Sequence, residues 1–156
     1  MCKSTDSGAW RRLAPSELEQ LEDALRERGL RLTTQRRAVC EAIFGCPGHI
    51  CAEHVLTVVS ERWPGPRMNK TTVYRTLDLL VELGLVSEHK CGDGPAQYEP
   101  ASRGRHSHAM CRRCGTLYNL DEGLAAELGE KLQARHGFLA ELASYPIFGV
   151  CANCRD

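Results

Sequence analysis

Two pairs of cysteines in this chain have the spacing of zinc ligands. Cys111 and Cys114 form one CxxC pair, and Cys151 and Cys154 form a second pair near the end of the chain. A CxxC turn presents two thiolates to one ion, and four thiolates complete the closed tetrahedral shell of a structural zinc site. We therefore expect one structural Zn²⁺ in each subunit. A redox dithiol is the alternative, but that chemistry needs only one pair.

Two histidines precede the first cysteine pair in the segment RHSHAMCRRCG, residues 105–115. Because side chains alternate between faces in extended backbone, His106 and His108 should point to the same side and form a metal clamp. Two surface histidines without a ligand are the alternative. Further ligands that could complete a site are available elsewhere in the chain: His49, Glu53, His89, Cys91 and Glu99.

The elements that must position these ligands begin with four amphipathic helices. Apolar residues recur at helical spacing between capping residues, glycines and prolines. The pattern predicts helices over about 15–29, 34–45, 52–63 and 71–84. The segment 85–99 then predicts two strands joined by a Gly-Asp-Gly turn. The last three of these helices, followed by the hairpin, have the order of a winged helix-turn-helix, whose last helix enters the DNA major groove.

A second, smaller unit follows in the chain. Its pattern predicts a strand through the first CxxC, a strand or turn at 116–120, a helix over 121–136 and a strand pair ending at the second CxxC. Because this unit is too small to bury a sizeable core alone, we expect a homodimer. A metal held between the two units would fix their angle and make DNA affinity depend on the metal.

The expected fold class is therefore α+β, with an N-terminal winged helix-turn-helix followed by a small α/β dimerisation domain. The expected domain boundaries are a mobile tail at 1–12, a DNA-binding domain at 13–100, a linker at 101–105 and a dimerisation and zinc-binding domain at 106–156.

Charge is balanced over the chain but not along it. Twenty basic and twenty acidic residues give a net charge of zero, which argues against a uniformly basic surface for nucleic acid. The segment 26–37, however, contains five arginines and a single glutamate. Such a patch can hold DNA phosphates, although a solvated helix face without a partner is the alternative.

Cysteine count and hydropathy indicate the compartment. The chain has nine cysteines, an odd number that cannot close into intramolecular disulfides alone. Neither a long apolar run nor an apolar signal core is found at the N-terminus or beyond it. We therefore expect a cytoplasmic protein with reduced thiols and no membrane partner.

With these motifs in order, the chain resembles the ferric uptake regulator family of bacterial metal-responsive regulators. The segments that carry the resemblance are RLTTQRRAV, HICAE, TTVYRTLDLLVELGLV, GDGPAQYE, HSHAMCRRCG, HGF and FGVCANC. The resemblance implies a homodimer that binds palindromic double-stranded DNA operators and represses metal-uptake genes when metal is bound. It implies base and phosphate contacts by Tyr74 and Arg75, a backbone contact by Arg36, and structural zinc at the four cysteines.

The resemblance also implies a regulatory metal site. The family's iron-type positions hold His49, Glu99, His106 and His108 in this sequence. Fe²⁺ is the favoured regulatory metal, and Zn²⁺, Mn²⁺ or peroxide sensing are the alternatives. His89 and Cys91 are possible alternative ligands, because a thiolate in the site would favour zinc.

Other family positions are filled by non-ligating residues. A further sensing site known in the family is expected to be absent, and zinc-type and peroxide-type ligands are missing. The residues found at those positions are Arg105, Ser107, Ala126 and Ala143 for the further site, Ala101 for the zinc type and Asn119 for the peroxide type.

Two other classes of protein compete with a regulator. A zinc-dependent hydrolase could use the histidine clamp with Glu53 or Glu99 as base, but the sequence has no HExxH motif. The second alternative is a protein-interaction module that zinc stabilises and that does not bind DNA. We expect neither enzymatic activity nor a small organic substrate.

Overall fold

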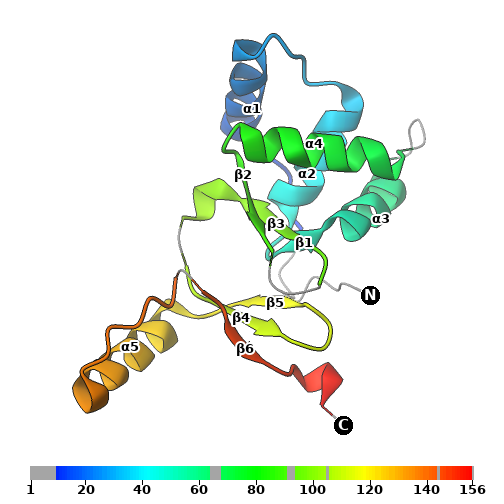
Figure 1. The fold of residues 1–156 in the computed structure, drawn as a ribbon. Coiled ribbons are helices and arrows are strands. Elements are labelled where there is room, and N and C mark those ends of the chain that lie inside the picture. The colour runs from blue at the N-terminus through cyan, green and yellow to red at the C-terminus, as the bar shows by residue number, and fades with distance from the viewer. Residues whose placement is uncertain (1–9, 64–67, 91–93, 105, 144, 156) are drawn as a thin grey trace.

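The computed structural model describes residues 10–63, 68–90, 94–104, 106–143 and 145–155. Figure 1 shows two groups of elements, one built from helices α1–α4 with a small sheet and the other from a second sheet with helix α5. Cys91 and Arg105, which the sequence singled out, lie outside the described residues.

Four helices form the N-terminal group close to where the sequence predicted them. They are α1 Pro15–Glu27, α2 Thr34–Gly45, α3 Ala52–Arg62 and α4 Lys70–Glu82. Thr33 caps α2 by accepting a hydrogen bond from the Arg36 backbone N–H, and Asn69 caps α4 by accepting one from Thr72 at 2.7 Å. The Asn69 cap explains why α4 begins at Lys70, one residue before the predicted start.

Residues 10–12, expected in the tail, contact the folded unit. The backbone N–H of Arg11 donates to the carbonyl of Gly45 at 3.2 Å. A Cβ atom at Gly45 would overlap the Arg11 carbonyl, so only glycine permits this close approach. The segment before α1 is thereby held against the end of α2.

The first sheet has three antiparallel strands, β1 Ile50–Cys51, β2 Val86–His89 and β3 Gln97–Pro100, in the order β1-β3-β2. The β2–β3 pair is the hairpin that the sequence predicted. The short strand β1 was not predicted. Its Ile50 pairs with Tyr98, which brings the preceding residue, His49, beside the β2–β3 hairpin, the wing of the winged helix.

The core of this group lies between α2, α3 and α4. Val73, Leu77 and Leu80 on one face of α4 are at most 1% exposed. Burying each such side chain contributes about 1.5–3 kcal/mol relative to leaving it in water. This packing fixes α4 against the other two helices and leaves its opposite face toward solvent.

The second sheet consists of β4 His108–Cys111, β5 Leu117–Asn119 and β6 Ile147–Gly149, in the order β5-β4-β6. The expectation of a strand pair before the second CxxC is wrong for the described residues, because β6 is the only strand that forms there. The described residues between α5 and β6 form turns and irregular backbone, and none of them pairs with a strand. A short 3₁₀ turn, η2 Ala152–Cys154, takes its place at the end.

Helix α5, Glu122–His136, and the segments around β6 leave apolar side chains in water. No residue of α5 is buried in the single chain. The exposed large apolar residues are Leu124, Phe138, Leu139, Tyr145, Ile147, Phe148 and Val150. Within the described ranges, no helix combines the length and apolar character needed to cross a membrane.

Candidate metal centres and DNA-binding surface

A buried carboxylate lies at the centre of the first ligand cluster. Glu99 is in β3, and its side chain is 3% exposed. Its Oε1 atom lies 2.8 Å from His89 Nε2 and 3.3 Å from His49 Nε2. His89 is the last residue of β2, and His49 immediately precedes β1, so three neighbouring strand segments bring these groups together.

Strand β4 and the residues just before it add two more histidines, His108 as the first residue of the strand and His106 two residues earlier. His108 Nε2 lies 3.7 Å from Glu99 Oε1, and His106 Nε2 lies 3.4 Å from Glu99 Oε2. The two rings have centroids 4.4 Å apart, in keeping with the same-side orientation expected from the HxH spacing. The cluster therefore connects the winged helix to the second sheet.

The tightest set of ligands differs by one residue from the set that the sequence favoured. The ligand atoms of His49, His89, Glu99 and His108 all lie within 4.8 Å of one another. His89, an alternative in the sequence, belongs to this set. His106 lies at its edge, where its ring contacts Asn119 Oδ1 at 3.0 Å and the carbonyl of Gly104 at 3.1 Å.

Unsatisfied buried atoms indicate that this cluster fits a metal ion. His49 Nε2, His108 Nε2 and Glu99 Oε2 are buried and have no well-aligned hydrogen-bond partner. Leaving such a group unpaired costs about 1–3 kcal/mol. A divalent cation would satisfy all three, and imidazole with carboxylate suits Fe²⁺, Mn²⁺ or Zn²⁺.

The protonation states of the cluster also favour metal binding. Burial by itself would raise the pKa of Glu99, but contacts with His108, His49 and His89 hold that pKa well below its ordinary value. Burial lowers the pKa of His49. The carboxylate is therefore ionised and the His49 imidazole neutral at physiological pH, which are the forms that coordinate a metal.

An arginine that the sequence assigned to the linker also contacts the cluster. Arg103 lies in the 3₁₀ turn η1 Ala101–Arg103 and donates to the carbonyl of Gly48 at 2.7 Å and to the carbonyl of Cys46. Its Nη1 atom is 3.7 Å from Glu99 Oε2. Arg103 thus ties the loop that carries His49 to the strand that carries Glu99. The only sequence signal for it was the four-residue spacing from Glu99.

The four cysteines of the two CxxC pairs converge at the other end of β4. The sulfur atoms of Cys111, Cys114, Cys151 and Cys154 lie within 4.8 Å of one another, and those of Cys114 and Cys151 are 3.8 Å apart. Four thiolates about 2.3 Å from one tetrahedral ion would be separated by nearly this distance. The donors and their separation therefore fit zinc.

Hydrogen bonds favour the thiolate form in this second cluster. The Cys151 backbone N–H donates to the Cys111 sulfur at 3.3 Å, and hydrogen bonds from Cys151 and Cys114 lower the pKa of Cys111 to about 6. A hydrogen bond from Tyr118 lowers the pKa of Cys151. Sharing a proton with Cys151 raises the pKa of Cys154 to about 12, so zinc binding would have to displace that proton.

The expected DNA contacts lie on the N-terminal group, away from both clusters. Arg75 is exposed on α4, whereas Tyr74 is partly buried and donates from its hydroxyl to Glu53 Oε1 at 3.2 Å. Arg36 donates to the carbonyl of Arg31 at 2.7 Å. DNA contact by these residues stays a prediction.

Glu53, the candidate base of the hydrolase alternative, has a different environment. Its carboxylate accepts the Tyr74 hydrogen bond and lies 2.9 Å from Lys70 Nζ. These contacts join α3 to the start of α4 and lower the pKa of Glu53. Glu53 is not among the residues that surround Glu99.

A winged helix is joined here to a second sheet, with one cluster of potential metal ligands around Glu99 and another at the four cysteines. This combination defines a class of protein, the metalloregulators. The chain belongs to the ferric uptake regulator family, a family of metal-responsive transcriptional regulators that matches residues 27–144. The ferric uptake regulation protein of Campylobacter jejuni is 27% identical over 139 residues, 89% of this chain and 88% of that protein.

Solved structures share the fold. The Helicobacter pylori ferric uptake regulator superposes with a TM-score of 0.69 at 22% identity, over 94% of this chain and 97% of that chain. A zinc uptake regulator solved with zinc and DNA is 28% identical, with a TM-score of 0.51 over 89% of this chain and 93% of that chain. Because relatives named for iron and for zinc both match, the comparisons leave the regulatory metal open.

Proposed function

We propose that this chain is a homodimeric transcriptional repressor that binds operator DNA when Fe²⁺ occupies the cluster around Glu99. The observation that carries the proposal is the position of this cluster. One carboxylate of the wing is surrounded by histidines from both sheets, so one ion would hold the winged helix and the second sheet together.

The proposed mechanism is a shift between orientations of the two units. His108 at the start of β4 and His106 just before it approach Glu99 from the second unit, while His49 and His89 approach it from the first sheet. A divalent ion would coordinate the buried nitrogen and oxygen atoms that have no hydrogen-bond partner, and would so attach the two units to each other. With the units locked, the α4 helices of a dimer would keep the spacing needed for two operator half-sites.

Iron is proposed because His49, Glu99, His106 and His108 stand at the iron-type positions of the family, and the described ligands are nitrogen and oxygen donors. Imidazole and carboxylate accept Fe²⁺, Mn²⁺ and Zn²⁺, whereas a thiolate would favour zinc. The four cysteines are proposed to hold a structural Zn²⁺ in each subunit. Their closed four-sulfur shell leaves no open position for regulation or catalysis.

The test is an anaerobic titration of zinc-loaded protein, freed of regulatory metal by a mild chelator, with Fe²⁺, Mn²⁺ or Zn²⁺. Binding to a labelled palindromic operator from the family is followed by fluorescence anisotropy. We expect DNA affinity to rise at least about tenfold with Fe²⁺, equivalent to about 1.4 kcal/mol. Equal affinity with and without every metal would contradict the proposal.

A pair of variants separates the site from general metal effects. His106→Ala combined with His108→Ala should abolish the metal response but keep the zinc, the fold and the dimer. His136→Ala removes an exposed histidine at the end of α5 and should respond as the wild type does. A metal response that survives in the double variant would place the regulatory site elsewhere.

A further inference from the structure

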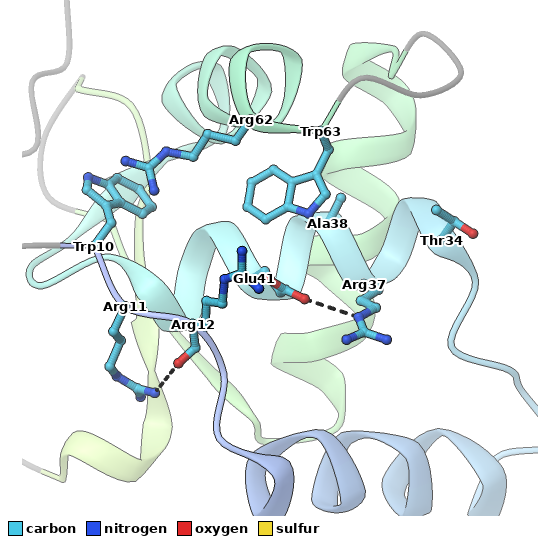
Figure 2. Close-up of a pocket in the computed structure, with 9 residues that line it drawn as sticks. All are labelled: Trp10, Arg11, Arg12, Thr34, Arg37, Ala38, Glu41, Arg62 and Trp63. Atoms are coloured by element: carbon cyan, nitrogen blue, oxygen red, sulfur yellow. Dashed lines mark hydrogen bonds and ion pairs between the residues drawn. The ribbon is translucent and has the colours of Figure 1, made fainter.

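A cavity of about 540 Å³ lies on the N-terminal group, between one face of α2, the end of α3 and the segment 10–12. Figure 2 shows that arginine and tryptophan side chains dominate its lining. It shares no residue with the two metal-ligand clusters or with the expected DNA contacts Arg36, Tyr74 and Arg75, although Arg37 in its lining belongs to the basic segment 26–37. The volume is within the range of pockets that hold small organic ligands, about 300–1,000 Å³.

The charges in this cavity are only partly compensated. Arg11 pairs with Glu17 at 2.6 Å, and Arg37 Nε pairs with Glu41 at 3.1 Å. Arg12 and Arg62 also line the cavity, but neither forms an ion pair within the described part of the chain. Two guanidinium groups are therefore available for an anion with more than one negative charge.

Two indole rings lie beside these charges. Trp10 and Trp63 are both partly exposed, and the Arg62 guanidinium carbon lies 4.9 Å from the centroid of a Trp10 ring. In Figure 2 the Trp63 ring lies next to Ala38, and both residues line the cavity. Indole faces stack on planar rings, and guanidinium groups pair with phosphate oxygens.

We propose that this cavity binds a nucleoside diphosphate or triphosphate. The base stacks on Trp63, and the phosphates lie between Arg12 and Arg62. Free nucleotides fit better than duplex DNA, because the bases of a duplex are stacked inside it and cannot reach an indole at the wall of a cavity. The guanidinium groups of Arg12 and Arg62 thus select the phosphates, and the indole of Trp63 selects the base.

The chain offers a direct readout, since Trp10 and Trp63 are its only tryptophans. Zinc-loaded full-length protein is titrated with ADP, GDP, pyrophosphate and adenosine. Intrinsic fluorescence is excited at the red edge of indole absorption, where adenine does not absorb. We expect saturable quenching by ADP or GDP with a dissociation constant below about 1 mM, and binding of pyrophosphate and of adenosine at least about tenfold weaker.

Variants test whether the cavity is responsible. Arg12→Ala combined with Arg62→Ala should weaken nucleotide binding at least about tenfold, whereas Arg135→Ala, an exposed arginine of α5, should leave it unchanged. Calorimetric titration of Trp63→Phe provides a measurement independent of fluorescence, and a partial loss of affinity is expected.

Three results would overturn the proposal. The first is the absence of saturable nucleotide binding to folded wild-type protein at millimolar concentration. The second is loss of nucleotide binding in the His106→Ala/His108→Ala variant, which would mean that the nucleotide binds through metal in the other cluster. The third is displacement of fluorescence quenching by a duplex whose affinity falls equally in the Arg12→Ala/Arg62→Ala variant, which would make this surface a DNA backbone contact.

Discussion

Arg103 shows how a residue that is not a ligand can determine the geometry of a ligand cluster. It holds the carbonyls of Cys46 and Gly48, which precede His49, and lies beside the Glu99 carboxylate. Groups that orient metal ligands commonly change metal affinity by about 10–100-fold when removed. Arg103 is therefore a positioning residue for the proposed regulatory site.

Arg103→Gln should weaken Fe²⁺ or Mn²⁺ binding about tenfold, because the His49 loop loses its tie to Glu99. Metal affinity is measured by competition with a chromophoric chelator, and thermal unfolding reports the fold. The matched change Arg135→Gln on α5 should leave metal affinity unchanged. Unaltered affinity in the Arg103 variant would show that the loop keeps its place without this side chain.

Chemistry at the residue scale was predictable where ligand type and spacing repeat. The CxxC pairs and the HxH clamp could be found because their spacing is fixed by local backbone geometry. The contacts of Arg103 and Asn119 with the cluster could not be predicted. They join residues far apart in the sequence, Arg103 to Gly48 and Asn119 to His106. His89 was found only as an alternative, since nothing local indicates that its ring meets Glu99.

At the scale of elements, helix α4 separates stability from recognition on its two faces. Leu77 is fully buried in the core, whereas Arg75 is exposed two residues earlier. The Asn69 cap and the Glu53 contacts hold the start of the same helix. Substitutions on the two faces should therefore have different consequences.

Leu77→Ala should lower the free energy of unfolding by about 2–5 kcal/mol, because it leaves a cavity in the core. Arg75→Ala should change that free energy by less than about 0.5 kcal/mol while weakening operator binding by about 1–3 kcal/mol. Chemical denaturation and anisotropy measure the two quantities. Undiminished DNA affinity in Arg75→Ala would remove this residue from the proposed interface.

The helices were predictable as elements because each has a strong apolar period and clear capping or stop signals. Strand β1 was not, because two residues are too short to show a period, and β1 exists only through its pairing with β3. The extra strand expected before the second CxxC failed for the opposite reason. The local pattern allowed a strand there, but none of the described strands pairs with this segment.

At the scale of the whole molecule, the exposed apolar residues of α5 and β6 need a partner. Residues such as Phe138, Leu139 and Phe148 are 59%, 76% and 45% exposed in the single chain. Large apolar side chains left this exposed indicate a surface that a protein partner covers. A second copy of the chain is the partner that the family fold leads us to propose.

Phe148→Glu should convert the dimer to monomer at micromolar concentration, because burying a carboxylate at the interface carries a desolvation cost even beside Arg112, whose guanidinium carbon lies 4.9 Å from the Phe148 ring. Sedimentation velocity measures the change. Glu61→Lys, an exposed charge reversal on α3, should remain dimeric. A dimeric Phe148→Glu protein would show that the chains associate through another surface.

Cys111→Ser should lose zinc and either unfold the second unit or produce monomers, because Cys111 is buried at the centre of the four-cysteine cluster. Zinc content and light scattering measure the outcome, and Cys154→Ser should behave alike. The His106→Ala/His108→Ala variant is the control that should keep both zinc and dimer. Identical behaviour of all three variants would contradict a division between structural and regulatory sites.

Strand β4 carries His108 at its first residue and Cys111 at its last. Ordering this strand from one end lowers the entropy that binding at the other end must still remove. The affinities of the two clusters are then linked, and linkage is reciprocal. Zinc at the cysteines should raise affinity for the regulatory metal, and regulatory metal should raise affinity for zinc by the same factor. In a cell starved of zinc, the protein should therefore bind its regulatory metal more weakly.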